Sequence, residues 1–460
     1  MKPSLHFHQI HFVGIGGSGM SSLAEIMYAW GFEISGSDSQ ENESVSRLRK
    51  LGCTINMGHN AAAIKNPDAV VFSSAIPKTN VEVVEAAHRS IPLIRRAEMM
   101  GEIIRGKYAF GVAGTHGKTT TTTMLGSIWK NAGKDPTLLA GGITRGENLS
   151  AVAGQSNTFI FEADEFDRSF LAMRPTSAII GNIDSDHLDC YGTFAEIQKA
   201  FTTFAGSIPF YGRLVVNADD AGVQSILHTV NKPSTIKYGV NSDSQYRASE
   251  IKNQGQGMVF TLAAHDKILG EIQLQVPGLH NVYNALAAAT LSLEEGLTFS
   301  QVAFGLKEFK GVKRRLEFKG QKSGVTFYDD YAHHPTEVTA TLEAARKLGT
   351  GRLIVVFQPH LYSRTQQLYR EFALAFSNCD EVFVTSIYPA REKPIPGVEG
   401  SLITEAIKNV NHSMEKVNYL TDLSSIPKKV SSRLSAGDVV VTMGAGDIGE
   451  YCLAIMEALP

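Results

Sequence analysis

The chain has 460 residues and a formal net charge of −3. At about 100–200 residues per domain, this length predicts two to four globular domains. The small net charge argues against nucleic acid as a partner. The 4 cysteines include no C-x-x-C pair, which argues against a zinc ribbon and suits a reducing compartment. No run of about 18 apolar residues and no signal-peptide core is present, so we expect a cytoplasmic protein without membrane insertion.

Residues 9–19 predict a strand, a glycine-rich turn and the start of a helix. The turn carries G-x-G-x-x-G at Gly14, Gly16 and Gly19, and the next strand ends at Asp38. In a dinucleotide fold, the helix N-terminus after such a turn binds a diphosphate and the acid lies near a ribose or a similar hydroxyl. The motif alone does not identify the ligand, and a purely structural turn is the alternative.

Polar side chains follow the next two strands of this predicted domain. Residues 69–76 predict a buried strand whose end carries Ser73 and Ser74. Arg95 and Arg96 lie where a later strand gives way to a helix. These two arginines are either a solvated pair or a clamp for an anionic ligand.

Residues 108–129 predict an apolar strand, a tight glycine turn and a helix. The backbone N–H groups of such a turn and the helix N-terminus form a site for phosphate oxygens. Lys118 adds a cation for the β- and γ-phosphates, and the Thr119 hydroxyl is placed to bind Mg²⁺. Only the second half of the P-loop pattern matches, because Val112 stands where the first glycine belongs. The alternative is an ordinary glycine turn before a threonine-rich helix.

Two later strands of the same predicted domain end in acidic clusters. The candidate metal ligands are Glu162, Asp164, Glu165 and Asp167 after the first strand, and Asp184, Asp186, His187 and Asp189 after the second. In phosphoryl-transfer enzymes a strand-end carboxylate holds the metal near the phosphate loop. A histidine among acids near such a loop is a better candidate ligand than a lone histidine. The pattern therefore predicts a site for one or two Mg²⁺ ions.

The end of this domain combines a β-rich segment with a helix. Residues 235–276 alternate in polarity and contain several glycines, which predicts a small antiparallel patch. Residues 277–296 predict a helix with His280, Asn281 and Asn284 clustered at its start. Helix capping would explain one asparagine, whereas the three polar side chains together could bind the edge of a nucleotide base.

The C-terminal part of the chain predicts a second doubly wound domain. The segment 309–320 is expected to be a linker, and a helix is expected to start at Pro335 with Glu337 in its first turn. Polar residues follow the predicted strands at Asp329, Asp330, Tyr331, His333, His334, Gln358, His360 and Arg364. Because open parallel sheets bind ligands at the carboxyl ends of their strands, we expect a second ligand site there.

Taken in order, these segments resemble the Mur ligase family, the ATP-dependent amide-bond ligases of bacterial cell-wall precursor assembly. The motifs that carry the resemblance cover nearly the whole chain: GIGGSGM (14–20), AGTHGKTTTT (113–122), EADE (162–165), NIDSDHLD (182–189), HNVYNALAA (280–288), GVKRRLE (311–317), DDYAHHPTE (329–337) and FQPHLYSRT (357–365). The last two are similar to the branch of the family that adds L-alanine to UDP-N-acetylmuramate.

The resemblance implies three α/β domains. Residues 1–106 would form a Rossmann-like domain for the UDP-sugar, so the first glycine turn would bind the UDP diphosphate rather than NAD. Residues 107–312 would form a central P-loop domain for ATP with a small antiparallel β patch. Residues 313–460 would form a second Rossmann-like domain on the amino-acid and nucleotide side.

The resemblance also implies roles for individual residues. The UDP-sugar site would comprise Gly14, Gly16, Gly17, Gly19, Met20, Asp38, Ser73, Ser74 and Arg96. The ATP site would comprise Gly114, Thr115, His116, Gly117, Lys118, Thr119, Thr120, His280, Asn284, Arg315 and Asp330. The amino-acid side would comprise Tyr331, His333, His360 and Arg364. Mg²⁺ is expected on Thr119, Glu162 and His187, and catalytic roles on Lys118, Glu162, His187, His333 and Arg364.

Sister ligases differ from this chain at one modified lysine. By count, the position of that lysine falls here on Phe201 or Thr202, with Lys199 the nearest lysine. We therefore expect the chain to work without the modified group. A separate expectation is that the chain is a monomer or weak homodimer.

Three rival functions remain open at this point. A recycling ligase would attach a preformed tripeptide to the same UDP-sugar. An NAD-dependent oxidoreductase would use the first glycine turn but would leave the phosphate loop without a role. A nucleotide-gated binding protein would not need the two acidic clusters.

Overall fold

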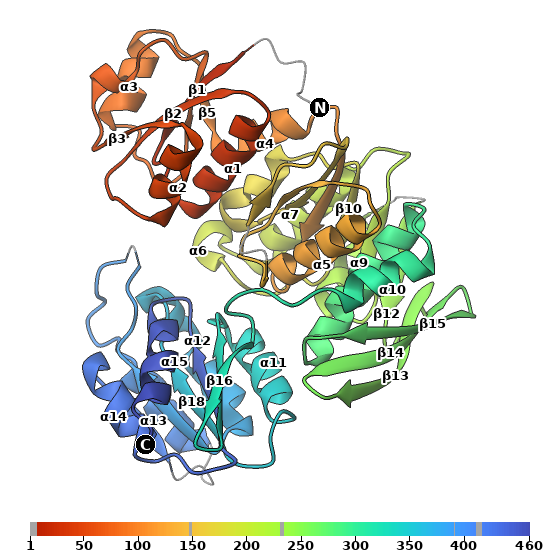
Figure 1. Ribbon diagram of the computed structural model, residues 1–460, viewed down its shortest axis with the longest axis vertical. Coiled ribbons are helices and arrows are strands. Elements are labelled where there is room, and N and C mark those ends of the chain that lie inside the picture. Colours follow the sequence, from red (N-terminus) through yellow and green to blue (C-terminus); the bar gives the residue numbers. More distant parts are fainter. Residues whose placement is uncertain (1–6, 147–149, 231–233, 391, 411–415) are drawn as a thin grey trace. The chain divides into compact units, whose positions relative to one another are not determined.

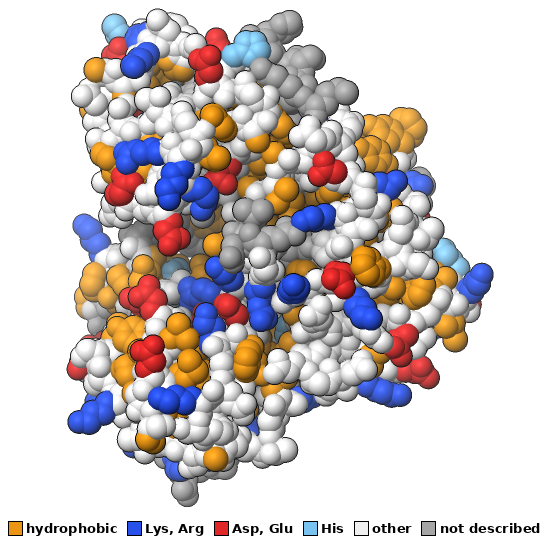
Figure 2. Space-filling view, in the orientation of Figure 1, with side chains coloured by type: hydrophobic (Ala, Val, Ile, Leu, Met, Phe, Trp, Pro, Cys, Tyr) orange, Lys and Arg blue, Asp and Glu red, His pale blue; other side chains and the backbone are white. Residues whose placement is uncertain are grey.

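The computed structural model describes residues 7–146, 150–230, 234–390, 392–410 and 416–460, apart from the side chain of Asp189. It is an α/β protein built on three sheets of five, ten and six strands (Figure 1). The predicted fold class is therefore confirmed. Acidic and basic side chains both occur over the face shown in Figure 2, in keeping with the small net charge.

The chain separates into two compact units. The first extends through Glu250 and also includes Phe260–Ile272 and Tyr283–Phe309. The second consists of Ile251–Val259, Gln273–Val282 and Lys310–Pro460. Within the described residues, no helix is long and apolar enough to cross a membrane.

The five-stranded sheet is parallel throughout, with the strand order β3-β2-β1-β4-β5. Its strands are β1 (Gln9–Val13), β2 (Glu33–Asp38), β3 (Thr54–Met57), β4 (Ala69–Phe72) and β5 (Leu93–Arg95). Its helices are α1 (Ser18–Ala29), α2 (Glu43–Leu51), α3 (Val81–His88) and α4 (Arg96–Ile104). The predicted strand–glycine turn–helix unit is confirmed, since β1 leads directly through the turn into α1.

The ten-stranded sheet has the order β15-β14-β13-β12-β11-β10-β6-β9-β7-β8. Its strands are β6 (Tyr108–Ala113), β7 (Thr137–Leu139), β8 (Ala151–Val152), β9 (Thr158–Glu162), β10 (Ser177–Ile180), β11 (Leu214–Asn217), β12 (Thr235–Gly239), β13 (Tyr246–Gln254), β14 (Gly257–Ala264) and β15 (Lys267–Leu274). Neighbouring strands from β13 to β15 are joined by two-residue connections, which only antiparallel strands allow. The antiparallel patch is thus confirmed, although β12 itself pairs in parallel with β11 and β13.

The helices of this part include the threonine-rich α5. They are α5 (Lys118–Asn131), α6 (Leu188–Tyr191), α7 (Phe194–Gly206), α8 (Ala221–Leu227), α9 (Leu279–Glu294) and α10 (Phe299–Lys307). The five threonines at the start of α5 are all buried. Thr123 Oγ1 donates a hydrogen bond to the Thr119 carbonyl at 2.8 Å, so this hydroxyl is satisfied inside the helix.

The six-stranded sheet lies in the second unit, with the order β16-β17-β21-β18-β19-β20. Its strands are β16 (Glu317–Lys322), β17 (Val325–Asp330), β18 (Leu353–Phe357), β19 (Glu381–Thr385), β20 (Val417–Leu420) and β21 (Val439–Met443). Its helices are α11 (Pro335–Ala345), α12 (Tyr362–Ala375), α13 (Ser401–Val410), α14 (Ile426–Ser431) and α15 (Ile448–Glu457). Only β16 is antiparallel to its neighbour.

One boundary differs from the sequence prediction. The segment 309–320 was expected to be a linker throughout, but its last residues form the start of β16. Leu316 and Phe318 pack with the core beneath the sheet, and this apolar contact explains why the segment joins the domain.

Candidate active site

A phosphate-loop geometry connects β6 to α5. Gly114 and Gly117 have φ angles of 142° and 76°, which side-chain-bearing residues rarely adopt. A Cβ on Gly117 would also lie 2.6 Å from Asn284 Oδ1. Glycine is therefore required at residue 117 on two grounds. The backbone N–H groups of the loop and of the N-terminus of α5 together form a site for an anion.

Lys118, the first residue of α5, forms a buried ion pair. Its Nζ lies 2.8 Å from Glu165 Oε2 and 3.9 Å from Asp164 Oδ1, and it donates to the Thr115 carbonyl at 3.2 Å. Burial alone would lower the pKa of Lys118, but the charges of Glu165, Asp164 and Glu162 outweigh burial and raise it. The ammonium group therefore stays charged at all physiological pH values.

Thr119 and Glu162 meet at the same edge of the sheet. The Thr119 hydroxyl donates to Glu162 Oε2 at 2.8 Å, and the Gly141 N–H donates to the same oxygen at 2.8 Å. A hydroxyl and a carboxylate side by side supply the hard oxygen donors that Mg²⁺ prefers. Two of the three predicted metal ligands thus lie together.

His187, the third predicted ligand, lies beside a different carboxylate. Its Nε2 is 3.8 Å from Glu165 Oε1 and 3.8 Å from Asp186 Oδ2. The residue has a φ angle of 56°, a strained backbone value of the kind found at functional sites. Glu165 therefore contacts both Lys118 and His187, whereas Glu162 contacts Thr119. The side chain of Asp189, the last acid of this cluster, lies outside the described part of the chain.

Asn182 is a residue of this site that the sequence interpretation did not single out. Its Oδ1 accepts the His116 N–H at 2.7 Å, its Nδ2 donates to the His116 carbonyl at 3.0 Å, and its own carbonyl accepts the Thr115 N–H at 3.1 Å. The Asn182 side chain thus binds both the N–H and the carbonyl of His116 and holds this part of the phosphate loop in place. Its position in the strand-end motif NIDSDH was the available signal.

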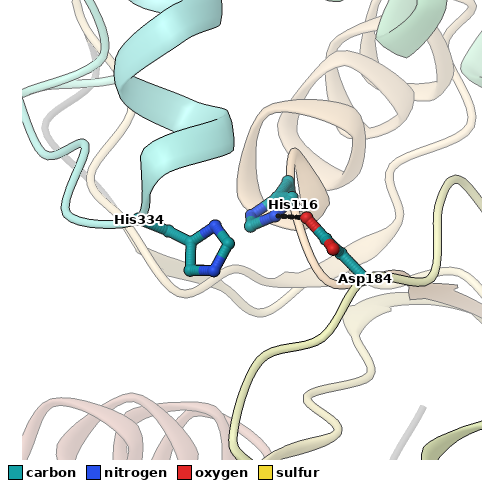
Figure 3. A group of neighbouring side chains, drawn as sticks. All are labelled: His116, Asp184 and His334. Carbon is teal, nitrogen blue, oxygen red and sulfur yellow. Dashed lines mark hydrogen bonds and ion pairs between the residues drawn. The ribbon is translucent and has the colours of Figure 1, made fainter. Parts of the chain in front are cut away.

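A second connection joins the same two segments. The Asp184 N–H donates to Thr115 Oγ1 at 2.9 Å. His116 Nε2 lies 3.2 Å from Asp184 Oδ2, the pair joined by a dashed line in Figure 3. The loop that begins at Gly114 and the strand end that carries His187 are therefore one hydrogen-bonded body.

Helix α9 contacts the phosphate loop through one predicted residue. Asn284 Oδ1 accepts a hydrogen bond from Thr121 Oγ1 at 3.1 Å. Its neighbour Tyr283 donates to Asp219 Oδ2 at 2.8 Å. Burial of Asp219 opposes ionisation, but bonds from the backbone of residues 240 and 241 and from Ser242 and Tyr283 lower its pKa to about 2. The charged Asp219 thus fixes the start of α9 beside the loop.

The first glycine turn is fastened to the end of β2. Asp38 Oδ2 accepts the Gly16 N–H at 2.8 Å. The guanidinium of Arg96 lies against Gly19, where a Cβ would come 3.1 Å from Nη1. Asp38, at the end of β2, and Arg96, at the start of α4, are thus brought to the same turn.

The other predicted residues of this turn differ in exposure. Gly17 caps α1, and Met20 is buried beneath its first turn. Ser73 is half-buried, and Ser74 is exposed. Gly17 and Ser74 are thus the residues of this group that are exposed to solvent.

In the second unit, Asp330 ends β17 in a buried position. It is 4% exposed, and it accepts the Leu316 N–H at 2.6 Å and the Ala332 N–H at 2.7 Å. Burial raises the pKa of Asp330 to about 6, and Arg315 and these two backbone donors oppose the rise. The carboxylate therefore holds the loop that follows β17.

That loop carries an ordered group of aromatic and charged side chains. His333 Nδ1 lies 3.0 Å from the Tyr331 carbonyl and 3.3 Å from Glu337 Oε2. The Arg315 guanidinium lies 5.4 Å from the centre of the Tyr331 ring and 3.6 Å from Glu337 Oε1.

Burial and Arg315 together lower the pKa of His280 to about 4, so His280 is neutral at physiological pH.

His360 and Arg364 follow β18 in the same unit. The His360 ring lies 5.9 Å from that of His333 and stacks on that of Tyr388 at 5.7 Å. Arg364 lies in the first turn of α12, which begins at Tyr362. Tyr388, which the sequence interpretation did not single out, thus belongs to this group through its stacked ring.

Comparisons with known proteins match the whole of this architecture. Three family models match in sequence: the Mur ligase family catalytic domain at residues 9–108, the Mur ligase middle domain at residues 112–292, and the Mur ligase glutamate ligase domain at residues 314–446. The chain is 43% identical to the UDP-N-acetylmuramate–L-alanine ligase of Salinibacter ruber, over 100% of this chain and 96% of that protein. It is 46% identical to the protein of the same name in Lawsonia intracellularis, over 95% of this chain and 96% of that protein.

Solved structures lead to the same family. The UDP-N-acetylmuramate–alanine ligase of Thermotoga maritima superposes with a TM-score of 0.81 at 30% identity, covering 98% of this chain and 99% of that one. The murein peptide ligase of Psychrobacter arcticus superposes with a TM-score of 0.69 at 28% identity, covering 98% of both chains. The family models cover most of the chain and the relatives match nearly all of it, and on this basis the chain belongs to the Mur ligase family.

Proposed function

We propose that this chain is an ATP-dependent ligase that joins L-alanine to the lactyl carboxylate of UDP-N-acetylmuramate in peptidoglycan precursor synthesis. The observation that carries the reaction class is the phosphate loop, where Lys118 and Thr119 lie against the strand-end carboxylates Glu165 and Glu162. The substrates rest on the full-length likeness to relatives that carry the name UDP-N-acetylmuramate–L-alanine ligase. A monomer or weak homodimer in the cytoplasm belongs to the same proposal.

The proposal divides the work among three parts of the chain. Residues 1–106 bind the UDP-sugar, with its diphosphate at the first glycine turn. Residues 107–312 bind ATP at the second turn, with the predicted small β patch attached. Residues 313–460 bind the amino acid and complete the nucleotide site. The hydrogen bond from Gly16 to Asp38 and the loop around Lys118 support the first two assignments.

Activation of the carboxylate is the first chemical problem. A carboxylate resists attack by an amine because its charge repels the nucleophile and oxide is a very poor leaving group. Transfer of the γ-phosphoryl group of ATP to the lactyl carboxylate gives an acyl phosphate, which has phosphate as its leaving group. Lys118 and the N–H groups at the start of α5 would neutralise the charge that spreads over the phosphoryl oxygens.

The residues present fit a divalent cation. Thr119, Glu162 and His187 would hold Mg²⁺, and Glu165, which lies beside His187, is a further candidate. The two carboxylates provide the charge, and the adjacent threonine hydroxyl provides a neutral oxygen donor. A bound Mg²⁺ ion would supply charge neutralisation for the triphosphate.

Formation of the amide requires a neutral amine. We assign the general base to His333. Its Nδ1 faces the Tyr331 carbonyl, which can only accept a hydrogen bond, so Nδ1 carries the proton. The lone pair is then on Nε2, which is able to take a proton from the alanine ammonium. Arg364 would bind the alanine carboxylate through its two-pronged guanidinium.

One assay tests this proposal. Phosphate release is measured with ATP, Mg²⁺ and UDP-N-acetylmuramate, with and without L-alanine. Release that requires both co-substrates, together with a product heavier by one alanyl residue, is the expected result. Release with the preformed tripeptide but not with alanine would instead assign the chain to the recycling ligases.

A further inference from the structure

Helix α3 carries a fully buried carboxylate on its inner face. Glu82 is 0% exposed, whereas the apolar side chains of Val81 and Val84 on the same helix are 49% and 52% exposed. Ala86, one helical turn from Glu82, packs into a small apolar cluster beside the five-stranded sheet. A charge at such a position opposes folding unless it is fully compensated. The buried position of this carboxylate therefore calls for an explanation other than core packing.

The compensation comes from side chains and backbone of the same sheet. Ser37 Oγ donates to Glu82 Oε2 at 2.5 Å, and the Asn60 N–H donates to Oε1 at 3.0 Å. His11 Nε2 and His59 Nδ1 lie 3.4 Å and 3.6 Å from Oε2. Burial alone would raise the pKa of Glu82, but the bonds from His11, Ser37 and Asn60 outweigh burial and lower it. Glu82 is therefore an ionised group whose partners come from β1, from β2 and from the turn after β3.

One of these partners also holds the first glycine turn. The Ser37 carbonyl accepts the N–H groups of Gly14 and Ile15 at 2.9 Å and 3.0 Å. The next residue, Asp38, accepts the Gly16 N–H at 2.8 Å. The end of β2 thus binds three successive N–H groups of the turn through its backbone and side chains. Its own position is set from the opposite side by the bond between Ser37 and Glu82.

We propose that Glu82 is a positioning residue for the UDP-sugar, which acts through Ser37 and the turn after β3 to set the geometry of the first glycine turn. The inference rests on the proposed function, because it takes the UDP-sugar diphosphate as the ligand of that turn. Glu82 does not itself touch the turn. Its contribution is to keep the end of β2 at the position where Gly14, Ile15 and Gly16 are held.

The test compares three variants of the full-length enzyme. Glu82→Gln keeps the shape of the side chain and removes its charge, and Ser37→Ala removes the hydroxyl that links it to β2. Glu33→Gln is the matched control, since Glu33 accepts from Gln9 Nε2 at 2.9 Å at the opposite end of the β1–β2 pair. For each variant, calorimetry gives the Kd of UDP-N-acetylmuramate, and steady-state kinetics give kcat and the KM of every substrate.

Glu82→Gln is expected to raise the Kd and KM of UDP-N-acetylmuramate by about tenfold, the scale of one charge-assisted hydrogen bond. The KM values of ATP and L-alanine and kcat should stay within about twofold of wild type on the same argument. Ser37→Ala should act in the same direction, and the double variant should add little, because both substitutions break one link. Glu33→Gln should leave all these constants unchanged.

Two outcomes would overturn the inference. One is a UDP-sugar Kd of Glu82→Gln and Ser37→Ala equal to that of wild type. The other is a parallel loss of every kinetic constant together with a lower melting temperature, since that pattern marks a purely structural role. Failure of the wild-type protein to bind UDP-N-acetylmuramate at all would be a different result, because it would remove the proposed function itself.

Discussion

Lys118 Nζ and Glu165 Oε2 lie 2.8 Å apart in a site where both side chains are almost fully buried. Truncating one partner leaves the other charge buried and unpaired, which is more damaging than losing an exposed pair. Two neighbouring acids, Asp164 and Glu162, add to the negative charge around the lysine. The electrostatics of the phosphate loop therefore depend on this one cation.

Lys118→Ala is expected to abolish ADP formation and to leave UDP-N-acetylmuramate binding unchanged, because the lysine lies at the second glycine turn and not at the first. A rate loss of at least about 10³-fold is expected from removing a cation at the phosphoryl group. Product formation and calorimetry measure the two effects. The control is Lys134→Ala, a substitution at an exposed lysine. Equal loss of both properties in Lys118→Ala would show that the domain assignment is wrong.

Glu162→Gln should weaken the response to Mg²⁺, because an amide oxygen replaces the charged oxygen beside the Thr119 hydroxyl. We expect the Mg²⁺ concentration for half-maximal rate to rise by about 10–100-fold. A titration of activity against free Mg²⁺ measures this shift. Glu196→Gln, at a glutamate of α7 whose side chain is 40% exposed, should leave the titration unchanged. An unaltered midpoint in Glu162→Gln would favour Glu165 as the carboxylate ligand.

Gly117→Ala tests the close approach between the phosphate loop and α9. The new Cβ would lie 2.6 Å from Asn284 Oδ1. Gly133 has a similar φ angle of 72° with no atom within 4 Å of its Cβ position, so Gly133→Ala introduces the same backbone strain without the contact. Both variants should lose about 1 kcal/mol of stability from strain. Only Gly117→Ala should raise the KM of ATP, and an equal KM in the two variants would contradict this explanation.

Asn182→Ala should loosen the phosphate loop without removing any group that binds ATP directly. Loss of the two bonds to His116 should raise the KM of ATP by about tenfold. Hydrogen exchange of residues 114–117 should become faster. Asn131→Ala, on the exposed end of α5, serves as the control. Unchanged exchange in Asn182→Ala would show that the loop is held by other contacts.

The raised pKa of Asp330 predicts a specific pH dependence of the free energy of unfolding. Its pKa is raised from 3.8 to about 6 in the folded state, so the folded state binds more protons than the unfolded state between these values. The free energy of unfolding therefore falls as pH rises through this range, by about 1–3 kcal/mol for this group. Asp330→Asn should lack that fall, which urea unfolding at stepped pH measures. A constant difference between wild type and variant from pH 3.8 to about 6 would contradict the raised pKa.

Local chemistry was enough to predict the elements around both glycine turns. Gly14, Gly114 and Gly117 signal backbone conformations that other residues rarely adopt, and the helices that follow are determined by neighbouring residues alone. The same holds for the Pro335 start of α11. The order of the motifs then identified the family. All of these signals lie within short stretches of chain, where steric limits on the backbone decide the outcome.

Tertiary structure decided which side chains meet. Sequence spacing could not assign partners to the acids in residues 162–165. In the folded structure, Glu162 contacts Thr119 and Glu165 contacts Lys118. Asn182 contacts residues 66 and 67 positions away, and Glu82 contacts groups from β1, from β2 and from the turn after β3. No local pattern encodes such contacts, because a buried polar group is satisfied only by whatever partners the folded sheet brings within hydrogen-bonding distance.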